Sequence, residues 1–308
     1  MIIPPFLKEG DTIGIIAPAR RMDEQDLIPA FDLLRNEGFN VFYDERLFAK
    51  EHRFAGSDDL RAEYIQSILD HPDIQAIWCV RGGYGSVRII DKLDFSGLCK
   101  HPKWLCGYSD VTVFHEHIHT CCDMATLHCE MPYHINDSHL RNEAVVTMLD
   151  ALRGKELRYE FPTHPLNRPG DFSAPVVGGN ISILYSINGS RSDLDTAGKI
   201  LFIEDLDEYL YHIDRMMYCL KRSGKLKNLS GLLVGHLNDM RDNPVPFGHT
   251  AEEIIAECCA EYDFPIIFNF PAGHLPDNRA IRMGCPMTVS CTAESVITTQ
   301  KALCDNLI

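Results

Sequence analysis

The sequence predicts an α/β fold of two domains: a mainly parallel sheet in the N-terminal domain and a smaller, sheet-rich α+β C-terminal domain. Three observations lead to this prediction. In the first half, short apolar runs alternate with helical patterns, which is the order of a parallel sheet covered by helices. In the second half, apolar runs follow one another with fewer helices between them. The chain's 308 residues exceed the roughly 250–300 at which a single hydrophobic core stops growing.

The first half repeats one pattern, a buried strand followed by an amphipathic helix. Residues 12–17 (TIGIIA) form a short apolar run that Pro18 ends, as is typical of a buried strand. Residues 24–37 place Leu27, Phe31 and Leu34 at helical spacing, and Gly38 follows as a C-terminal cap. By the same criteria we expect strands at 39–44, 74–80 and 103–109, and helices at 58–69, 81–93 and from 111 to about 119.

The boundary between the domains is predicted from residues 154–175, which contain four prolines and two glycines and show no periodicity. We interpret this segment as a linker between an N-terminal domain at 1–153 and a C-terminal domain at 176–308. The second domain has short apolar runs at 181–187, 199–205, 229–237 and 265–270 and helical patterns at 210–224 and 249–262. Two closing strands are expected within 280–298.

Charge and hydropathy exclude several classes of partner. The chain has 44 acidic and 29 basic side chains, a net charge of −15, which opposes non-specific binding to nucleic acid and to anionic lipid. No stretch reaches the roughly 18 uninterrupted apolar residues of a membrane span. The N-terminus lacks a basic segment before a long apolar one, so it does not read as a signal peptide. We therefore expect a cytoplasmic protein with no nucleic-acid or membrane partner.

Twelve scattered cysteines, none in a C-x-x-C pair, fit a cytoplasmic protein if they are reduced. His119, Cys121 and His128 lie in the densest patch and could form the zinc site of a metallohydrolase. Because the patch lacks the paired spacing of a closed structural site, small apolar residues on a helix are the favoured interpretation. We expect no metal and no cofactor.

Ser109 lies in WLCGYSDVTVFH, at the junction of a predicted buried strand and a helix. A nucleophile at such a junction is raised out of the sheet on a tight turn. The backbone N–H of Asp110 would then point at an oxyanion from the first turn of the helix. The G-x-S-x-G pattern is incomplete, because Val111 replaces its second glycine. On local sequence alone, a serine that only caps the helix is favoured.

RGGYGS (81–86) also follows a strand, and three interpretations of it are equally open. Its spacing matches neither common nucleotide-binding pattern, so a phosphate cradle is weakly supported. The glycines could instead allow the backbone to approach a substrate carbonyl. A plain turn between strand and helix is the third interpretation.

Glu204 and His274 are the remaining candidates for chemistry. Glu204 ends the apolar run KILFIE, so it is expected to be partly buried, and a buried carboxylate needs a partner. The acidic cluster that it begins, with Asp205, Asp207 and Glu208, could instead hold a metal or lie in solvent. His274 is in a loop punctuated by proline and glycine, which can hold an imidazole at a cleft.

Taken together, these segments resemble the LD-carboxypeptidase family of serine peptidases, which also contains the microcin C immunity peptidases. The resemblance covers most of the chain. It comprises GDTIGIIAPA, RGGYGS, GYSDVT, VVGGNISIL, LFIEDLDE and PAGH, in this order. One such motif would be weak, but six in order make chance similarity improbable.

The resemblance implies a Ser–His–Glu triad. Ser109 would be the nucleophile, His274 the base, and Glu204 the carboxylate that fixes the imidazole tautomer. The implied oxyanion donors are the N–H of Asp110 and one from the RGGYG loop, for which we choose Gly83.

The implied substrate is a cytoplasmic muropeptide in peptidoglycan recycling. The bond cleaved joins the L-centre of meso-diaminopimelate or lysine to a terminal D-alanine. Since such a substrate has a free carboxylate, a cation is needed near the cleft, and Arg81 is the candidate. The resemblance also implies a homodimer.

Two alternatives stay open. The microcin-type relatives cleave a peptide–nucleotide conjugate and tend to have an aromatic-bearing insertion that stacks on the base. Residues 154–175 contain no tryptophan, only Tyr159, Phe161 and Phe172, which favours the carboxypeptidase. A non-catalytic nucleotide- or amino-acid-binding module would give Glu204 and His274 no reason to converge.

Overall fold

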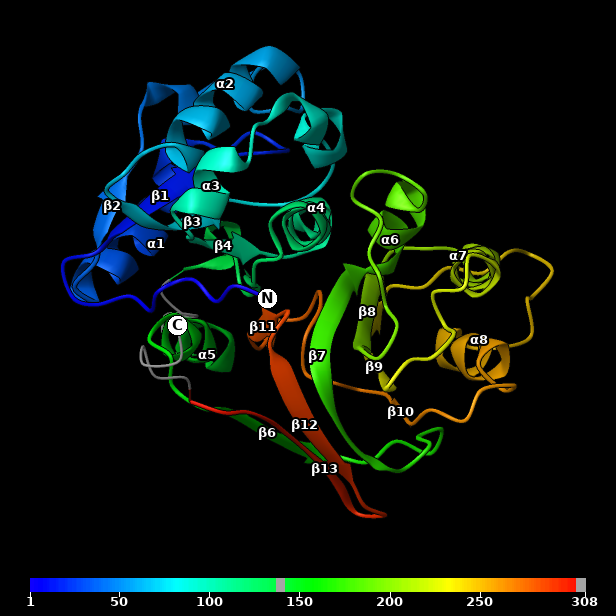
Figure 1. Ribbon diagram of the computed structural model, residues 1–308. Coiled ribbons are helices and arrows are strands. Elements are labelled where there is room, and N and C mark those ends of the chain that lie inside the picture. Colours follow the sequence, from blue (N-terminus) through cyan, green and yellow to red (C-terminus); the bar gives the residue numbers. More distant parts are fainter. Residues whose placement is uncertain (137–141, 303–308) are drawn as a thin grey trace.

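The computed structural model describes residues 1–136 and 142–302. It contains a six-stranded and a seven-stranded sheet, and helices lie beside both (Figure 1). The predicted fold class is confirmed: parallel strands dominate the first sheet, and the second is mixed.

The N-terminal sheet has the strand order β11-β5-β4-β3-β1-β2. Its first five strands in sequence are parallel to their neighbours, and β11 pairs antiparallel with β5. The strands are β1 (Thr12–Ile16), β2 (Asn40–Phe42), β3 (Ile74–Cys79), β4 (Trp104–Gly107), β5 (Thr126–His128) and β11 (Ile281–Met283). The helices of this half are α1 (Glu24–Asn36), α2 (Asp58–Leu69), α3 (Ser96–Lys100), α4 (Thr112–Cys122) and α5 (Glu143–Leu152).

The C-terminal sheet has the order β10-β9-β8-β7-β12-β13-β6, parallel from β10 to β7 and antiparallel from β7 to β6. Its strands are β6 (Leu157–Pro162), β7 (Asp171–Asn180), β8 (Ile200–Leu206), β9 (Gly231–Asn238), β10 (Ile266–Ile267), β12 (Pro286–Cys291) and β13 (Ser295–Gln300). Its helices are α6 (Ile181–Ile187), α7 (Leu210–Arg222) and α8 (Ala251–Cys258).

Four sequence-based expectations about local structure need correction. Residues 154–175 are not an unstructured linker, because β6 and the start of β7 lie there. The apolar run at 181–187 is a helix, since Asn180 Oδ1 accepts a hydrogen bond from the Ile183 N–H and caps it. Three strands, not two, form after residue 280. Residues 81–93 form two short 3-10 turns, because Gly83 and Gly85 adopt positive φ angles of 113° and 149° that interrupt a helix.

One pair of cysteines does not meet the condition, set out above, that the cysteines be reduced. Cys122, in the last turn of α4, packs against α3 and is joined to Cys99 in a disulfide, with the Cα atoms 5.3 Å apart. This Cα separation is within the usual range for a disulfide. The other cysteines in the part of the chain that the structure describes are free thiols.

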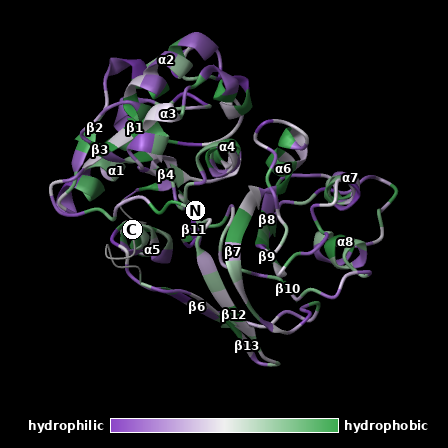
Figure 2. Ribbon diagram, in the orientation of Figure 1, coloured by the Kyte–Doolittle hydropathy of each residue, from purple (hydrophilic) through white to green (hydrophobic). Residues whose placement is uncertain are grey.

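The hydrophobic core joins the two halves rather than dividing them. One cluster of buried side chains runs from the N-terminal sheet to Phe202 on β8 and Met287 on β12. A second cluster lies between β7–β10 and helices α6–α8. Figure 2 shows hydrophobic residues along the strands β7 and β8. Because one cluster crosses the junction, the two sheets are held in a defined relative position.

Polar bonds reinforce this junction. Glu116 on α4 is fully buried, and its Oε1 accepts a hydrogen bond of 2.9 Å from the Gly178 N–H on β7. Thr112 Oγ1, at the start of α4, accepts one of 3.1 Å from the Asn180 N–H at the end of β7. Helix α4 is therefore bonded directly to the strand beside β8.

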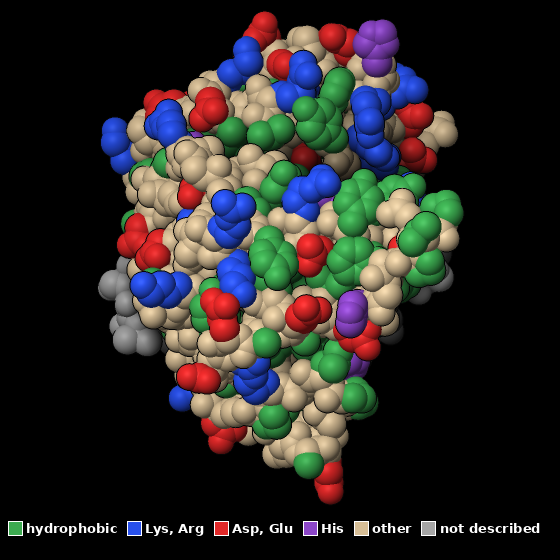
Figure 3. Space-filling model, turned by 90° about the vertical axis from the view of Figure 1, so that its right-hand side faces the viewer, with side chains coloured by type: hydrophobic (Ala, Val, Ile, Leu, Met, Phe, Trp, Pro, Cys, Tyr) green, Lys and Arg blue, Asp and Glu red, His purple; other side chains and the backbone are tan. Residues whose placement is uncertain are grey.

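On the face seen in Figure 3, charged side chains of both signs surround a group of hydrophobic ones. Exposed large hydrophobic residues of the C-terminal half include Tyr209, Tyr211, Tyr218, Val245 and Phe247. Within residues 1–136 and 142–302, every helix is too short or too polar to cross a membrane.

We expect Gly178→Ala to destabilise the protein strongly. Gly178 has a φ of +112°, and a Cβ there would lie 2.2 Å from the carbonyl oxygen of Phe202 on the neighbouring strand. Strain of about 1–2 kcal/mol adds to about 1–3 kcal/mol of overpacking. The free energy of unfolding, from urea titration, should fall by about 2–5 kcal/mol. Gly189→Ala is the control, because Gly189 has a φ of +78° with open space around it. Equal losses in the two variants would contradict this account.

Candidate active site

Ser109 lies directly after β4 on a sharp turn that leads into α4. Its φ is +64°, a left-handed conformation that is uncommon for residues other than glycine. Gly107, which ends the strand, has a φ of +152°. A strained turn between a strand and a helix presents a serine hydroxyl above the edge of the sheet, as in the nucleophile elbow of α/β-hydrolases. The sequence-based placement of Ser109 between strand and helix is thus correct.

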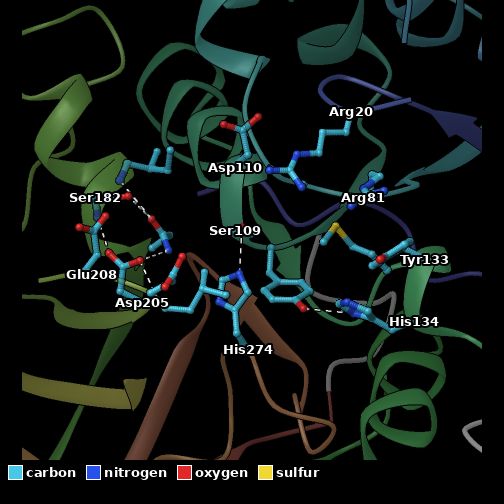
Figure 4. A pocket seen from close by; sticks show the side chains of 18 residues that line it. Arg20, Arg81, Ser109, Asp110, Tyr133, His134, Ser182, Asp205, Glu208 and His274 are labelled. Carbon is cyan, nitrogen blue, oxygen red and sulfur yellow. Dashed lines mark hydrogen bonds between the residues drawn. The ribbon is translucent and has the colours of Figure 1, made fainter. Parts of the chain in front are cut away.

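Three side chains from separate elements form one chain of hydrogen bonds. The Ser109 hydroxyl lies 3.0 Å from His274 Nε2, and His274 Nδ1 lies 2.7 Å from Glu204 Oε2. Figure 4 shows the His274 ring pointing at Ser109 in the middle of a cavity. Ser109 follows β4, Glu204 lies on β8, and His274 is in the loop after β10. With the hydroxyl donating to Nε2, Nδ1–H donates to the carboxylate.

Burial and charge act in opposite directions on the His274–Glu204 pair. Burial alone disfavours the charge on the fully buried Glu204, but the charge and hydrogen bond of His274 outweigh it and lower the pKa of Glu204. Burial likewise opposes charge on His274, but the neighbouring Glu204 carboxylate outweighs it and raises the pKa of His274. The carboxylate therefore makes the imidazole a stronger proton acceptor.

Gly273 allows His274 and Glu204 to meet. Its φ is +128°, and a Cβ at this position would lie 3.3 Å from Glu204 Oε2. A side chain there would be strained and would press on the carboxylate. The glycine of the PAGH motif is thus explained by the close approach of the loop to β8.

The RGGYGS loop packs against the Ser109 turn. A Cβ on Gly82 would lie 3.0 Å from Ser109 Cβ and 3.1 Å from its Oγ, so the loop backbone runs beside the hydroxyl. Asp110 fixes the loop, because its buried carboxyl accepts a 2.9 Å hydrogen bond from the Ser86 N–H. The N–H groups of Asp110 and Gly83 donate to no other group of the described chain. Both residues line the cavity.

This cavity, of about 570 Å³, has walls of opposite charge. Arg20 and Arg81 lie on one side of Ser109 in Figure 4, and Asp205 and Glu208 lie on the other. Within residues 1–136 and 142–302, neither arginine forms a salt bridge. Burial and the charges of neighbouring arginines lower the pKa of Arg20. Two cations held close together without a carboxylate make a site for an anion.

Each arginine is held by its surroundings. The Arg81 guanidinium lies 3.9 Å from the centre of the Tyr133 ring, a cation–π contact. Arg20 Nε is buried and has no hydrogen-bond partner, and the Arg20 side chain packs against Gly83. Sequence reasoning named Arg81 and missed Arg20. The signal for both is the same: each follows a strand of the parallel sheet, β1 for Arg20 and β3 for Arg81.

The acidic wall is organised by hydrogen bonds. Asp205 accepts bonds from the Asn180 side chain at 3.0 Å and the Ser182 N–H at 2.9 Å. Burial and the adjacent Glu204 raise the pKa of Asp205 to about 7. Glu208 Oε2 lies 2.6 Å from His212 Nδ1. From the sequence alone, this cluster could be a metal site or a solvated helix start. In the structure Asp205 is buried and accepts a hydrogen bond from Asn180, the residue that caps α6.

A second cavity, of about 430 Å³, adjoins the first. The two share Tyr108, Tyr133, His134, Leu206 and His274. The site is therefore a groove that continues past His274, long enough for a ligand larger than a single amino acid.

The structure does not assemble the alternative zinc site. His119 Nε2 bonds Thr126 Oγ1, His128 Nε2 bonds Asn278 Oδ1, and Cys121 Sγ lies 3.5 Å from His117 Nε2. The described part of the chain contains no group of three or more His, Cys, Asp or Glu side chains that could hold a metal ion. The binding-module alternative, which gave Glu204 and His274 no reason to meet, also disagrees with their 2.7 Å contact.

Comparisons with known proteins identify the family of this chain. Residues 13–129 match the LD-carboxypeptidase N-terminal domain, and residues 173–289 match the LD-carboxypeptidase C-terminal domain. A probable murein peptide carboxypeptidase of Bacillus subtilis is 33% identical, with 94% of this chain and 92% of that protein covered.

Two solved structures share the fold. The muramoyltetrapeptide carboxypeptidase of Oxalobacter formigenes matches with a TM-score of 0.85 and 26% identity, over 94% of this chain and 98% of that one. The microcin C7 self immunity protein MccF matches with a TM-score of 0.86 over 99% and 100% of the two chains, but with 19% identity. That likeness shows the fold alone. On the matches to both domains and to the Bacillus relative, this chain belongs to the LD-carboxypeptidase family and is a serine-type carboxypeptidase.

Proposed function

We propose that this protein is an LD-carboxypeptidase that releases the terminal D-alanine from murein tetrapeptides, with Ser109, His274 and Glu204 as its catalytic triad. The observation that carries the proposal is the pair of hydrogen bonds from Ser109 to His274 and from His274 to Glu204. The names of a relative and of a structural neighbour, both carboxypeptidases of murein peptides, support the substrate class.

The proposed reaction begins when Ser109 Oγ attacks the carbonyl carbon of the scissile amide. The hydroxyl proton passes to His274 Nε2, and Glu204 stabilises the imidazolium. The N–H groups of Asp110 and Gly83 would bind the oxyanion, which their position beside Ser109 and their lack of other acceptors support.

His274 then gives its proton to the leaving amine, and D-alanine departs. His274 then accepts a proton from a water molecule, whose oxygen attacks the remaining ester. As the ester breaks, His274 returns this proton to Ser109 Oγ. The first proton transfer runs along the hydrogen bond between Ser109 and His274 that the structure already contains, so it needs little rearrangement.

We propose that Arg20 and Arg81 bind the carboxylate of the terminal residue. A carboxypeptidase differs from an internal peptidase in requiring this charge, and both guanidinium groups face the cavity without a salt bridge. The continuation of the groove into the second cavity gives room for the rest of the tetrapeptide.

The microcin-type alternative receives no support from the aromatic residues of 154–175. Tyr159 and Phe161 are buried, and the Tyr159 hydroxyl donates to the carbonyl of Ala280. These two rings are therefore not available to stack on a base, and the third, Phe172, is partly buried against the hydrophobic core. The cytoplasmic location, with its role in peptidoglycan recycling, and the homodimer stay predictions from the family resemblance.

Ser109→Ala should abolish hydrolysis and leave the fold unchanged, because the alanine cannot form the acyl-enzyme. We expect release of alanine from a tetrapeptide with an L-D terminal bond to fall at least about a thousandfold, measured by mass spectrometry beside the L-L isomer. Circular dichroism checks the fold. Residual activity within tenfold of wild type would falsify the nucleophile assignment, and equal cleavage of both isomers would refute the LD specificity.

Glu204→Gln should lower turnover at least about a hundredfold, since the amide can favour the wrong imidazole tautomer. It should also change the pH profile. The Glu204 charge raises the pKa of His274 above its usual 6.5, so wild-type kcat/KM should rise with pH through a value above 6.5. Without that charge the same rise should occur at lower pH.

Asp277→Asn is the control for this experiment, because Asp277 lies three residues after His274 and pairs with Arg279. It should keep the wild-type profile. Wild-type turnover in Glu204→Gln, with an unchanged acid limb, would mean that Glu204 does not orient the base.

Arg20→Met and Arg81→Met should each reduce the preference for a peptide with a free terminal carboxylate over the same peptide amide. A charged hydrogen bond of about 1.5–3 kcal/mol corresponds to roughly tenfold to a hundredfold in kcat/KM. Arg88→Met, which removes a guanidinium paired with Asp58 at the start of α2, is the matched control. An unchanged carboxylate-to-amide ratio in both cavity variants would rule out this carboxylate site.

A further inference from the structure

Two buried side chains, His128 and Asn278, fasten the loop that carries His274 to the N-terminal sheet. Both are fully buried. His128 ends β5, where it is the register partner of Gly107 on β4, two residues before Ser109. Asn278 belongs to the same loop as His274. The pair therefore connects the strand next to the serine with the loop that holds the imidazole.

One oxygen atom makes this connection. Asn278 Oδ1 accepts a 2.9 Å hydrogen bond from the Gly273 N–H and lies 3.0 Å from His128 Nε2. A backbone N–H can only donate, so the amide group facing it must be the oxygen, and His128 must carry a proton on Nε2. Burial lowers the pKa of His128, so the neutral ring makes this bond as a defined tautomer.

The Gly273 peptide decides where His274 points. Gly273 has a φ of +128° and no side chain to restrict it. The loop is closed by the Arg279 N–H, which donates to the Pro271 carbonyl, and Asn278 holds the Gly273 N–H, which belongs to the peptide between Ala272 and Gly273. Within the described residues, the His274 ring itself bonds only Glu204 and Ser109.

We propose that His128 and Asn278 are positioning residues, which set the distance between His274 and Ser109 by holding the Gly273 peptide against β5. The inference rests on the proposed function of His274 as the base. Neither residue touches the serine or lines the catalytic cavity. They act through the loop, and a displacement of about 1 Å at a catalytic group can cost a hundredfold in rate.

The test compares kcat, KM and pH profile across four variants. Asn278→Ala and His128→Leu each remove the bridge, and we expect kcat to fall about tenfold to a hundredfold with KM within about twofold of wild type. His128→Gln, whose amide can donate from the place of Nε2, should recover most of the rate. The double variant Asn278→Ala/His128→Leu should lose little more than either single one, because both remove the same bond.

The acid limb of the pH profile separates misplacement from general destabilisation. The pKa of His274 is lowered by burial and raised by Glu204, Asp205 and Glu130, and Tyr108 packs against the ring. If the loop moves away from Glu204, His274 loses most of the interaction that raises its pKa. The limb should therefore move to lower pH in Asn278→Ala and return in His128→Gln.

Thr147→Val is the matched control. Thr147 Oγ1 accepts a 3.1 Å hydrogen bond from the Ala280 N–H, at the far end of the same segment. Its loss should lower Tm about as much as Asn278→Ala and leave kcat and the acid limb at wild-type values. A kcat within twofold of wild type in Asn278→Ala, equal kcat losses in Thr147→Val, or independent losses in the double variant would each overturn the proposal.

Labelling with a phosphonofluoridate probe, which bonds the active serine and releases fluoride, separates this inference from the substrate assignment. If wild type is labelled at Ser109 but does not cleave the L-D tetrapeptide, slower labelling of Asn278→Ala still supports the bridge. Equal labelling rates for wild type and Asn278→Ala would overturn the bridge and leave the substrate assignment unaffected. If wild type is neither labelled nor active, both proposals fail. Should His128→Leu not fold, Asn278→Asp, which keeps the acceptor oxygen, must label faster than Asn278→Ala.

Discussion

The hydrogen bonds from Glu204 through His274 to Ser109 cross from one sheet to the other, and the site exists only while the two sheets keep their relative position. Hydrogen bonds of 2.7 and 3.0 Å tolerate displacements of a few tenths of an ångström. The junction is correspondingly rigid. A shared hydrophobic cluster fills it, and α4 is bonded to the end of β7 by the Thr112 hydroxyl and the Glu116 carboxylate.

The Glu204 carboxylate is a charge placed within this apolar junction, and it needs a partner there. Glu204 is fully buried, so its charged form is costly unless a partner compensates it. His274 is that partner, and the resulting pair has a low carboxylate pKa and a high imidazole pKa. The same low-dielectric surroundings that make the charge costly strengthen its effect on the ring. Gly273 permits the contact because it places no side chain between them.

The functional groups collect where parallel strands end. Arg20, Arg81 and Ser109 follow β1, β3 and β4 of one sheet, and Glu204 lies near the carboxyl end of β8 in the other. Ligand sites of open α/β sheets lie outside these ends. Here two such edges face each other across one cavity, which gives a cationic wall from the first sheet and an acidic wall from the second.

Local sequence determined most of the elements that support the site, including the strand before Ser109, the apolar strand of Glu204 and the glycine-punctuated loop of His274. Their periodicity and turn residues are properties of a few neighbouring positions. Local sequence did not predict the structure of segments whose conformation depends on residues distant in the chain. The run at 181–187 is equally apolar as a strand or a helix. Asn180, which caps the helix, is held in place by Thr112 and Asp205, both distant in sequence. The proline-rich stretch at 154–175 becomes β6 only because β13 offers it a partner.

The order of the six motifs was enough to name the family, and with it the residues Ser109, Glu204 and His274. Only the tertiary structure decided how they meet, that Arg20 joins Arg81, and that His128 and Asn278 brace the loop of the base. The last two are 150 positions apart, and a hydrogen bond over that separation leaves no periodic signal in the chain. Pattern in a sequence records which face of an element is buried, whereas the partner on that face is fixed by the packing of the sheets.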